Sequence, residues 1–156
     1  MKGNEKIIAK LNDLLSDELT AVNQYMVHAE MDDNWAYTRL AETVEKRAID
    51  EMKHAEKLIA RILYLEGIPM VSSYKKINIG ADVQKQIGHD WDAEFGAIKS
   101  YNDGIKLCSE LGDNGTEQLL KAILNDEEAH IDWIEAQKDQ ISQVGVQMYL
   151  AEQIKE

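Results

Sequence analysis

The chain has 156 residues, which is enough for one domain with a hydrophobic core. One proline, nine glycines and many good helix formers favour an all-helical protein. The formal net charge is −12, which argues against a nucleic-acid-binding protein, because such proteins need a basic surface. No stretch of the sequence approaches the roughly 18 consecutive apolar residues that a membrane-spanning helix requires.

The first two predicted helices form a hairpin. The first has a stripe of regularly spaced residues: Leu11, Leu15, Glu18, Val22, Tyr25 and Ala29. The second has a similar stripe: Val44, Ala48, Glu51, Ala55, Leu58, Ile62 and Leu65. Alternating steps of three and four residues are typical of a helix packed nearly parallel to its neighbours. The polar segment 31–34, MDDN, is expected to join the two helices.

A long connection precedes the next two helices. Residues 66–80, EGIPMVSSYKKINIG, break the helical spacing with two glycines and a proline. The third stripe then runs through Ile87, Trp91, Glu94, Ile98, Tyr101, Ile105 and Cys108. The fourth runs through Leu120, Leu124, Glu127, Ile131 and Ile134. Segment 111–116, LGDNGT, is expected to join them, with Thr116 as the candidate N-cap.

Two helical hairpins joined by one long crossover describe the ferritin-like variant of the four-helix bundle. We therefore predict a single domain over 1–156, with the bundle at 5–143. Behind Gly145, the segment VGVQMYLAEQIKE predicts a short C-terminal helix at 145–156.

Each of the four stripes contains one glutamate, and two of these glutamates have a histidine three residues later. The first such motif is EMKH at 51–54 and the second is EEAH at 127–130. Residues three apart share a helix face, so each Glu–His pair can reach one metal ion. One E-x-x-H motif is a weak signal, whereas two of them with two further stripe glutamates are a strong one.

A constant offset of 76 residues relates the two halves of the chain. It joins five pairs: Glu18 and Glu94, Tyr25 and Tyr101, Asp50 and Asp126, Glu51 and Glu127, and His54 and His130. The two hairpins therefore look like related halves that face each other across an approximate two-fold axis. Such an axis would generate two metal positions with similar ligands. Duplication and convergent geometry are both compatible with the offset.

Four ionised carboxylates in a helical core are costly unless other groups compensate them. Two divalent cations would cancel their charge. The alternative is pairing with lysine or arginine, but the same stripes contain no basic residue. Mixed carboxylate and imidazole ligands suit iron or manganese, and zinc can occupy such sites too.

These motifs resemble the bacterioferritin family over nearly the whole chain. The resemblance is carried by NDLLSDELTAVNQYMVHAEM, DEMKHAEKLI and DEEAHIDWI. It implies a di-iron centre (Fe2+/Fe3+) with six ligands: Glu18, Glu51, His54, Glu94, Glu127 and His130. By the same resemblance Glu51 and Glu127 bridge the two irons. Tyr25 is either a hydrogen-bonding or redox residue of this centre or a core aromatic residue.

Met52 follows Glu51 directly, about 100° further round the helix, so it is expected to point sideways or outward. The resemblance implies that Met52 from each of two subunits ligates one haem b per subunit pair. Without the resemblance, Met52 reads as an ordinary methionine of a dimer interface. Met26 and Met31 are expected to pack near the same interface, and His28 and His89 to be structural or solvent-facing.

The resemblance further implies iron storage by a ferroxidase in a 24-subunit shell built from dimers. Its reactants would be Fe(II) and O₂ or H₂O₂, and a bacterioferritin-associated ferredoxin would deliver electrons through the haem to release iron. Some relatives have an accessory iron site on the cavity side, but Lys46 and Arg47 occupy that stretch here. Four residues match the family's entry pores: Asn34, Glu66, Asp132 and Asp139.

Cys108 is the only cysteine, which excludes an internal disulfide and the four-cysteine iron domain of a rubrerythrin. The segment MKGNEKIIAKLND lacks the apolar core of a signal peptide, so a reducing, cytoplasmic location is expected. Two alternatives remain open. One is a di-iron peroxidase without storage, and the other is a structural or haem-carrying shell subunit with an inactive centre.

Overall fold

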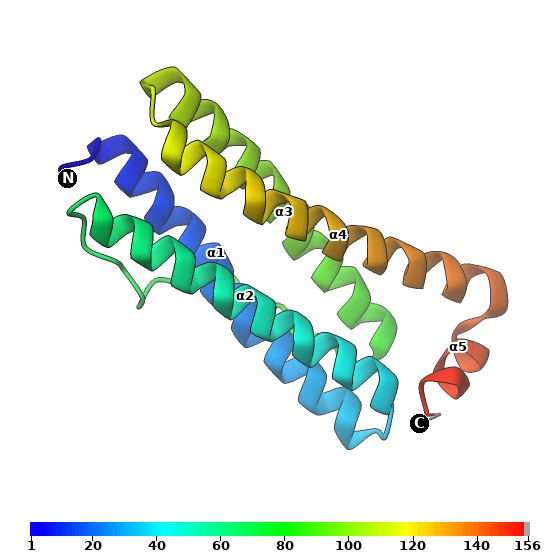
Figure 1. The fold of residues 1–156 in the computed structure, drawn as a ribbon. Helices are drawn as coiled ribbons and strands as arrows, with labels where there is room; N and C mark the ends of the chain where they lie inside the picture. The colour runs from blue at the N-terminus through cyan, green and yellow to red at the C-terminus, as the bar shows by residue number, and fades with distance from the viewer. Residues whose placement is uncertain (155–156) are drawn as a thin grey trace.

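The computed structural model describes residues 1–154 and contains five helices in that range. They are α1 (Glu5–Asn34), α2 (Thr38–Tyr64), α3 (Val83–Leu111), α4 (Asn114–Val144) and α5 (Val146–Gln153). The hairpin of α1 and α2 packs beside that of α3 and α4, and α5 closes one end of the bundle (Figure 1). The predicted ferritin-like bundle with a short C-terminal helix is confirmed. Residues 155 and 156 of the predicted helix 145–156 lie outside the described part.

The hydrophobic core is divided into two clusters along the bundle. One is built on residues such as Leu11, Leu58 and Leu120, and the other on residues such as Val44 and Ile134. The four stripe glutamates fall between these clusters in the sequence of every helix, and all four are buried. The apolar clusters therefore lie on both sides of a central polar layer along the bundle. No helix within residues 1–154 has the length and apolarity to cross a membrane.

Both predicted hairpin connections need correction. The expected loop at 31–34 is wrong, because α1 continues through Asn34 and only residues 35–37 link it to α2. Ala36 makes the turn with a φ of 61°, and the Trp35 backbone N–H still donates to the Met31 carbonyl. Asp32 lies on the buried face of α1, so this polar segment is part of the packed helix rather than an exposed loop.

The connection between α3 and α4 is also shorter than predicted. Gly112 ends α3 in the left-handed region, with a φ of 72°, a conformation that glycine adopts at little cost. The N-cap of α4 is Asp113 rather than Thr116, because the Asp113 carboxylate accepts from the Thr116 backbone N–H at 3.0 Å. Thr116 instead sits in the first turn and donates its hydroxyl to the same carboxylate.

The long crossover between α2 and α3 is held by a row of polar side chains on α1. Each side chain hydrogen-bonds a backbone group of residues 68–80, and the row repeats every four residues: Asn12, Ser16, Thr20, Gln24 and His28. Residues four apart share a helix face, so α1 presents one face to the crossover and another to the core. The prediction of a structural His28 is thus confirmed. Its Nε2 accepts from the Gly80 N–H and its Nδ1 contacts Asp90 at 2.8 Å.

Candidate metal centre

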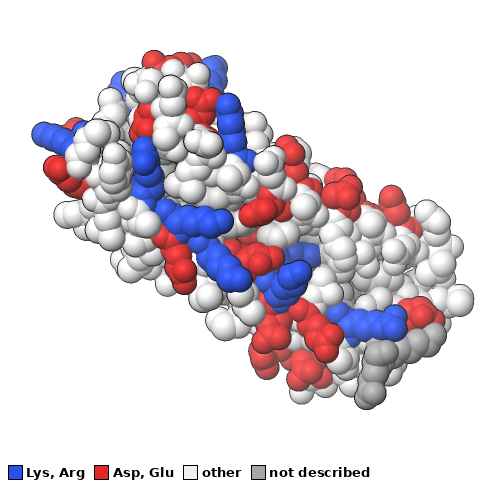
Figure 2. Space-filling view, in the orientation of Figure 1, with Lys and Arg blue, Asp and Glu red and all other residues white. Residues whose placement is uncertain are grey.

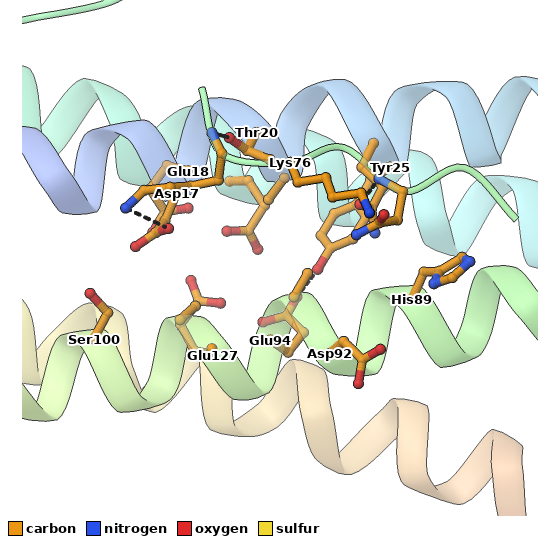
Figure 3. A pocket seen from close by; sticks show the side chains of 18 residues that line it. Asp17, Glu18, Thr20, Tyr25, Lys76, His89, Asp92, Glu94, Ser100 and Glu127 are labelled. Atoms are coloured by element: carbon orange, nitrogen blue, oxygen red, sulfur yellow. Dashed lines mark hydrogen bonds and ion pairs between the residues drawn. The ribbon is translucent and has the colours of Figure 1, made fainter. Parts of the chain in front are cut away.

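Four glutamates, one from each long helix, meet in the middle of the bundle. Each is only 1–2% exposed: Glu18 from α1, Glu51 from α2, Glu94 from α3 and Glu127 from α4. Glu18 points from α1 toward Glu94 and Glu127, which come from the opposite hairpin (Figure 3). Helical stripes that would otherwise carry leucine or isoleucine therefore converge on one cluster of carboxylates.

The cluster divides into two groups of four potential ligands. The ligand atoms of each group all lie within 4.8 Å of one another. One group contains Glu18, Glu51, His54 and Glu127, and the other contains Glu51, Glu94, Glu127 and His130. Glu51 and Glu127 belong to both groups, so they stand between two adjacent positions where a cation could bind. This is the arrangement that the offset of 76 residues predicts from the sequence.

Both histidines present Nδ1 to the carboxylates. His54 Nδ1 lies 2.8 Å from Glu127 Oε1, and His130 Nδ1 lies 2.8 Å from Glu51 Oε1. Each histidine thus reaches across to the glutamate of the other E-x-x-H motif. The two rings are stacked with their centroids 6.2 Å apart. The imidazoles therefore close the side of the cluster formed by α2 and α4.

The chemistry of these side chains fits a pair of metal ions. In each of the six, one buried side-chain atom makes no hydrogen bond of regular geometry: Glu18 Oε2, Glu51 Oε1, His54 Nδ1, Glu94 Oε2, Glu127 Oε1 and His130 Nδ1. The two Nδ1 atoms nevertheless lie at ion-pair distance from carboxylate oxygens. Buried polar atoms are rarely left without a partner, because each costs about 1–3 kcal/mol. Oxygen and imidazole nitrogen atoms are the donor set that divalent iron, manganese and zinc accept. The six orphaned atoms are where such ions would bind.

Burial and mutual repulsion shift the protonation of the carboxylates. Burial first, and then the charge of Glu51, raise the pKa of Glu18 and of Glu127 well above the usual range. Burial also acts to raise the pKa of Glu51, but hydrogen bonds from Glu18 and both histidines outweigh it and lower that pKa. Without a metal, the cluster therefore relies on shared protons to limit its negative charge.

The histidines are held in the charged form by the same carboxylates. Burial favours neutral His54, but hydrogen bonds and charges of Glu18 and Glu51 prevail and raise its pKa to about 11. The pKa of His130 rises to about 10, where Glu51 and Glu94 outweigh burial in the same way. In the metal-free protein both imidazoles therefore carry a proton on Nδ1 at neutral pH.

Zinc(II) binding should therefore release protons. If Nδ1 of each histidine is a ligand, filling both positions should expel at least about two protons at pH 7, one from each histidine and any further ones from Glu18 and Glu127, whose pKa values are raised. The affinity should fall as the pH falls, by about tenfold per pH unit for each proton released. Calorimetry in buffers of different ionisation enthalpy, repeated between about pH 6 and 8, measures both quantities. An affinity that stayed constant over this range would contradict the assignment of Nδ1 as a ligand.

Two buried tyrosines donate hydrogen bonds to Glu18 and Glu94, the two glutamates that each belong to only one of the two groups. The Tyr25 hydroxyl donates to Glu94 Oε1 at 2.6 Å, and the Tyr101 hydroxyl donates to Glu18 Oε1. Burial, followed by the charge of the bonded glutamate, raises the pKa of both phenols well above normal, so both stay protonated. The sequence alone predicts no role for Tyr101, although its offset of 76 residues from Tyr25 is a signal that indicates one.

Asp50 and Asp126 flank the cluster on its outer side. Asp126 Oδ2 lies 2.9 Å from His54 Nε2, and Asp50 Oδ2 lies 3.5 Å from His130 Nε2. The sequence placed both residues one position before a stripe glutamate but could not show which histidine each would meet. The structure shows that each contacts the histidine of the other hairpin.

A pocket of about 410 Å³ leads to the cluster between α1, α3 and the crossover. Its walls include Asp17, Lys76, His89 and Asp92, all labelled in Figure 3, and its floor reaches Glu18, Glu94 and Glu127. His89 is therefore neither a ligand nor part of the core, but lines this approach.

Met52 lies outside the cluster, as its position after Glu51 predicts. Its side chain is 45% exposed, in a groove between α1 and α2 that also contains Met26. Glu30 and Glu45 supply acidic groups to the same groove. The four residues matched to family pores are all exposed and away from the cluster: Asn34, Glu66, Asp132 and Asp139. Lys46 is exposed too, whereas Arg47 is buried with its guanidinium 4.7 Å from the Trp133 ring centroid.

Comparison with known proteins agrees with the fold. The family model described as the ferritin-like domain matches residues 8–144. A bacterioferritin from Brucella melitensis is 42% identical over 149 residues, covering 96% of this chain and 92% of the relative. A bacterioferritin from Mycobacterium avium is 38% identical over 152 residues, covering 97% and 96% respectively. One from Rhodobacter capsulatus is 36% identical over 147 residues, covering 94% and 91%.

Proposed function

Because the chain belongs to the bacterioferritins, within the ferritin-like family, we propose that it stores iron and oxidises Fe(II) at the central cluster. One observation carries the proposal: six side chains converge with buried oxygen and nitrogen atoms that make no regular hydrogen bond, in two groups that share Glu51 and Glu127. In this proposal the four remaining ligands serve one position each: Glu18 and His54 the first, Glu94 and His130 the second.

Charge supports two divalent ions as the substrate of this site. Two Fe(II) ions bring four positive charges, which balance four glutamates once the displaced protons have left. Each Fe(II) gives up one electron. The pair therefore reduces one O₂ to H₂O₂ with two protons, or one H₂O₂ to two waters with two protons.

The protein contributes positions and protons to this reaction. Glu51 and Glu127 keep the two irons adjacent, so both electrons can leave toward one oxidant. The hydroxyls of Tyr25 and Tyr101 fix the orientation of the terminal glutamates. We propose a redox role for Tyr25 as well: when only one Fe(II) is available to an H₂O₂, the phenol would give the second electron needed to form two waters, and its hydroxyl proton would pass to the Glu94 carboxylate 2.6 Å away.

Storage requires a shell, and we propose the 24-subunit assembly of the family, built from dimers. Apolar side chains along the crossover suit burial between subunits, since several are more than half exposed in the single chain: Ile68, Met70, Val71 and Tyr74. The groove around Met52 would face its counterpart across the dimer axis and bind one haem b there. A small ferredoxin would supply electrons to this haem when iron is released.

Aerobic iron loading followed by size exclusion tests the storage function. With many more than two Fe(II) per chain, we expect the iron to co-elute with protein of about 425 kDa, the mass of 24 chains of 17.7 kDa. Cobalt(II), which the oxidant does not convert to mineral under the same conditions, serves as the control cation. A monomer or dimer that retains no more than two irons per chain would contradict storage and favour a di-iron peroxidase.

A further inference from the structure

The proposed ligands leave unexplained the aspartate that precedes each shared glutamate. Asp126 Oδ2 is 2.9 Å from His54 Nε2, and Asp50 Oδ2 is 3.5 Å from His130 Nε2. Both pairs line one hollow of about 320 Å³ between α2 and α4. Acidic and basic side chains are interspersed on the face of the molecule drawn in Figure 2. A general excess of one charge therefore does not explain why each aspartate lies beside a histidine.

The orientation of the histidines supplies this explanation. Each imidazole directs Nδ1 into the carboxylate cluster and Nε2 out toward an aspartate. A neutral imidazole has one N–H, and a nitrogen that binds a metal must offer its lone pair. The proton must therefore reside on Nε2 whenever Nδ1 binds a cation. An acceptor at Nε2 fixes both that proton and the plane of the ring.

We propose that Asp126 and Asp50 are positioning residues that hold His54 and His130 with Nδ1 available to the metal. This inference rests on the proposed metal centre. It assigns a task to the first position of each D-E-x-x-H motif: the glutamate bridges, the histidine ligates, and the aspartate orients the histidine of the other motif.

The pairing is reciprocal between the hairpins. Asp126 on α4 serves His54 on α2, and Asp50 on α2 serves His130 on α4. Neither hairpin alone therefore presents an oriented histidine, and the metal positions are complete only when the two hairpins have packed together. The five-residue motif thus contributes to both positions at once.

The two pairs are unequal in this structure. The side chain of His54 is 2% exposed and makes the closer contact, whereas that of His130 is 14% exposed and its contact is longer. The shorter contact constrains its histidine more strongly, although the Asp126 side chain is 54% exposed and that of Asp50 is 34% exposed. We therefore expect the loss of Asp126 to weaken the position of Glu18 and His54 more than the loss of Asp50 weakens the other position.

Anaerobic titration of the metal-free assembly with Co(II) tests the inference. The d–d absorption reports ligand geometry independently of any turnover. In Asp126→Ala we expect one of the two Co(II) ions to bind about 10–100-fold more weakly, with an altered spectrum. Asp50→Ala should show a smaller loss at the other ion. Asp126→Asn should fall between alanine and wild type, since its amide carbonyl can still accept from Nε2–H.

Glu128→Ala is the matched control, because it removes an exposed acidic side chain two residues further along α4, on a different face. Two Co(II) per chain in wild type and in this control, with the loss confined to the aspartate variants, supports the inference. Wild-type affinity and spectrum in Asp126→Ala and Asp126→Asn would overturn it while leaving the proposed function intact. A failure of the wild-type protein to bind two Co(II) would instead refute the proposed function itself.

Discussion

Replacing both shared glutamates, Glu51→Gln with Glu127→Gln, should abolish rapid Fe(II) oxidation. The two residues are the members of both four-ligand groups, so their loss removes two ligands from each position at once. Electrostatic stabilisation by bridging groups is worth several kcal/mol, so the initial rate should fall by at least about a hundredfold. Stopped-flow absorption after mixing with aerobic Fe(II) measures this rate.

Glutamine keeps the volume of glutamate and one acceptor oxygen, which can still face the histidine Nδ1–H, and it cannot carry a negative charge. The metal-free double variant should therefore stay folded, with a thermal midpoint no more than about 5 °C below wild type. Glu128→Gln, an exposed change of the same chemistry beside Glu127, should leave the rate unchanged. A double variant that oxidises Fe(II) at the wild-type rate would sink the assignment of the centre.

Substituting Met52→Leu should eliminate the Soret band of the haem-loaded protein. The thioether of Met52 lies at the surface of the groove between α1 and α2, where leucine preserves the apolar volume but offers no lone pair for the haem iron. With one ligand from each of two subunits, the substitution removes both axial ligands. Absorption spectra of protein purified after haem supplementation, scaled to protein concentration, provide the measurement.

Met26→Leu is the matched control for haem binding, since Met26 lines the same groove and is 50% exposed. It should retain the wild-type band. If Met52→Leu keeps the band and Met26→Leu loses it, Met26 rather than Met52 is the axial ligand of the haem, and the assignment of Met52 is wrong. Rapid Fe(II) oxidation should persist in both variants, because neither methionine belongs to the buried cluster.

The parts of the fold that sequence could predict are those set by periodicity. The alternating stripes identify four long helices, and the 76-residue offset brings four glutamates and two histidines together before any geometry is known. These features follow from helix repeat and burial alone. The four glutamates also predict a charged layer in the middle of the bundle, because a carboxylate in an apolar stripe requires a compensating cation or proton.

The features that sequence missed depend on contacts between segments. The segment at 31–34 looks like a loop by polarity, yet the buried Asp32 continues α1. The role of the polar row from Asn12 to His28 could not be predicted from the sequence, because the row hydrogen-bonds backbone groups of an irregular crossover. The contact of Asp126 with His54 crosses between hairpins, so its partner could be identified only after the hairpins were docked.

Anomalous diffraction from crystals of the iron-loaded protein locates the metal without relying on activity. We expect two iron peaks within each chain. One should lie among Glu18, Glu51, His54 and Glu127, and the other among Glu51, Glu94, Glu127 and His130. A bundle in which these six side chains bind no iron, or iron peaks found only between subunits, would contradict it.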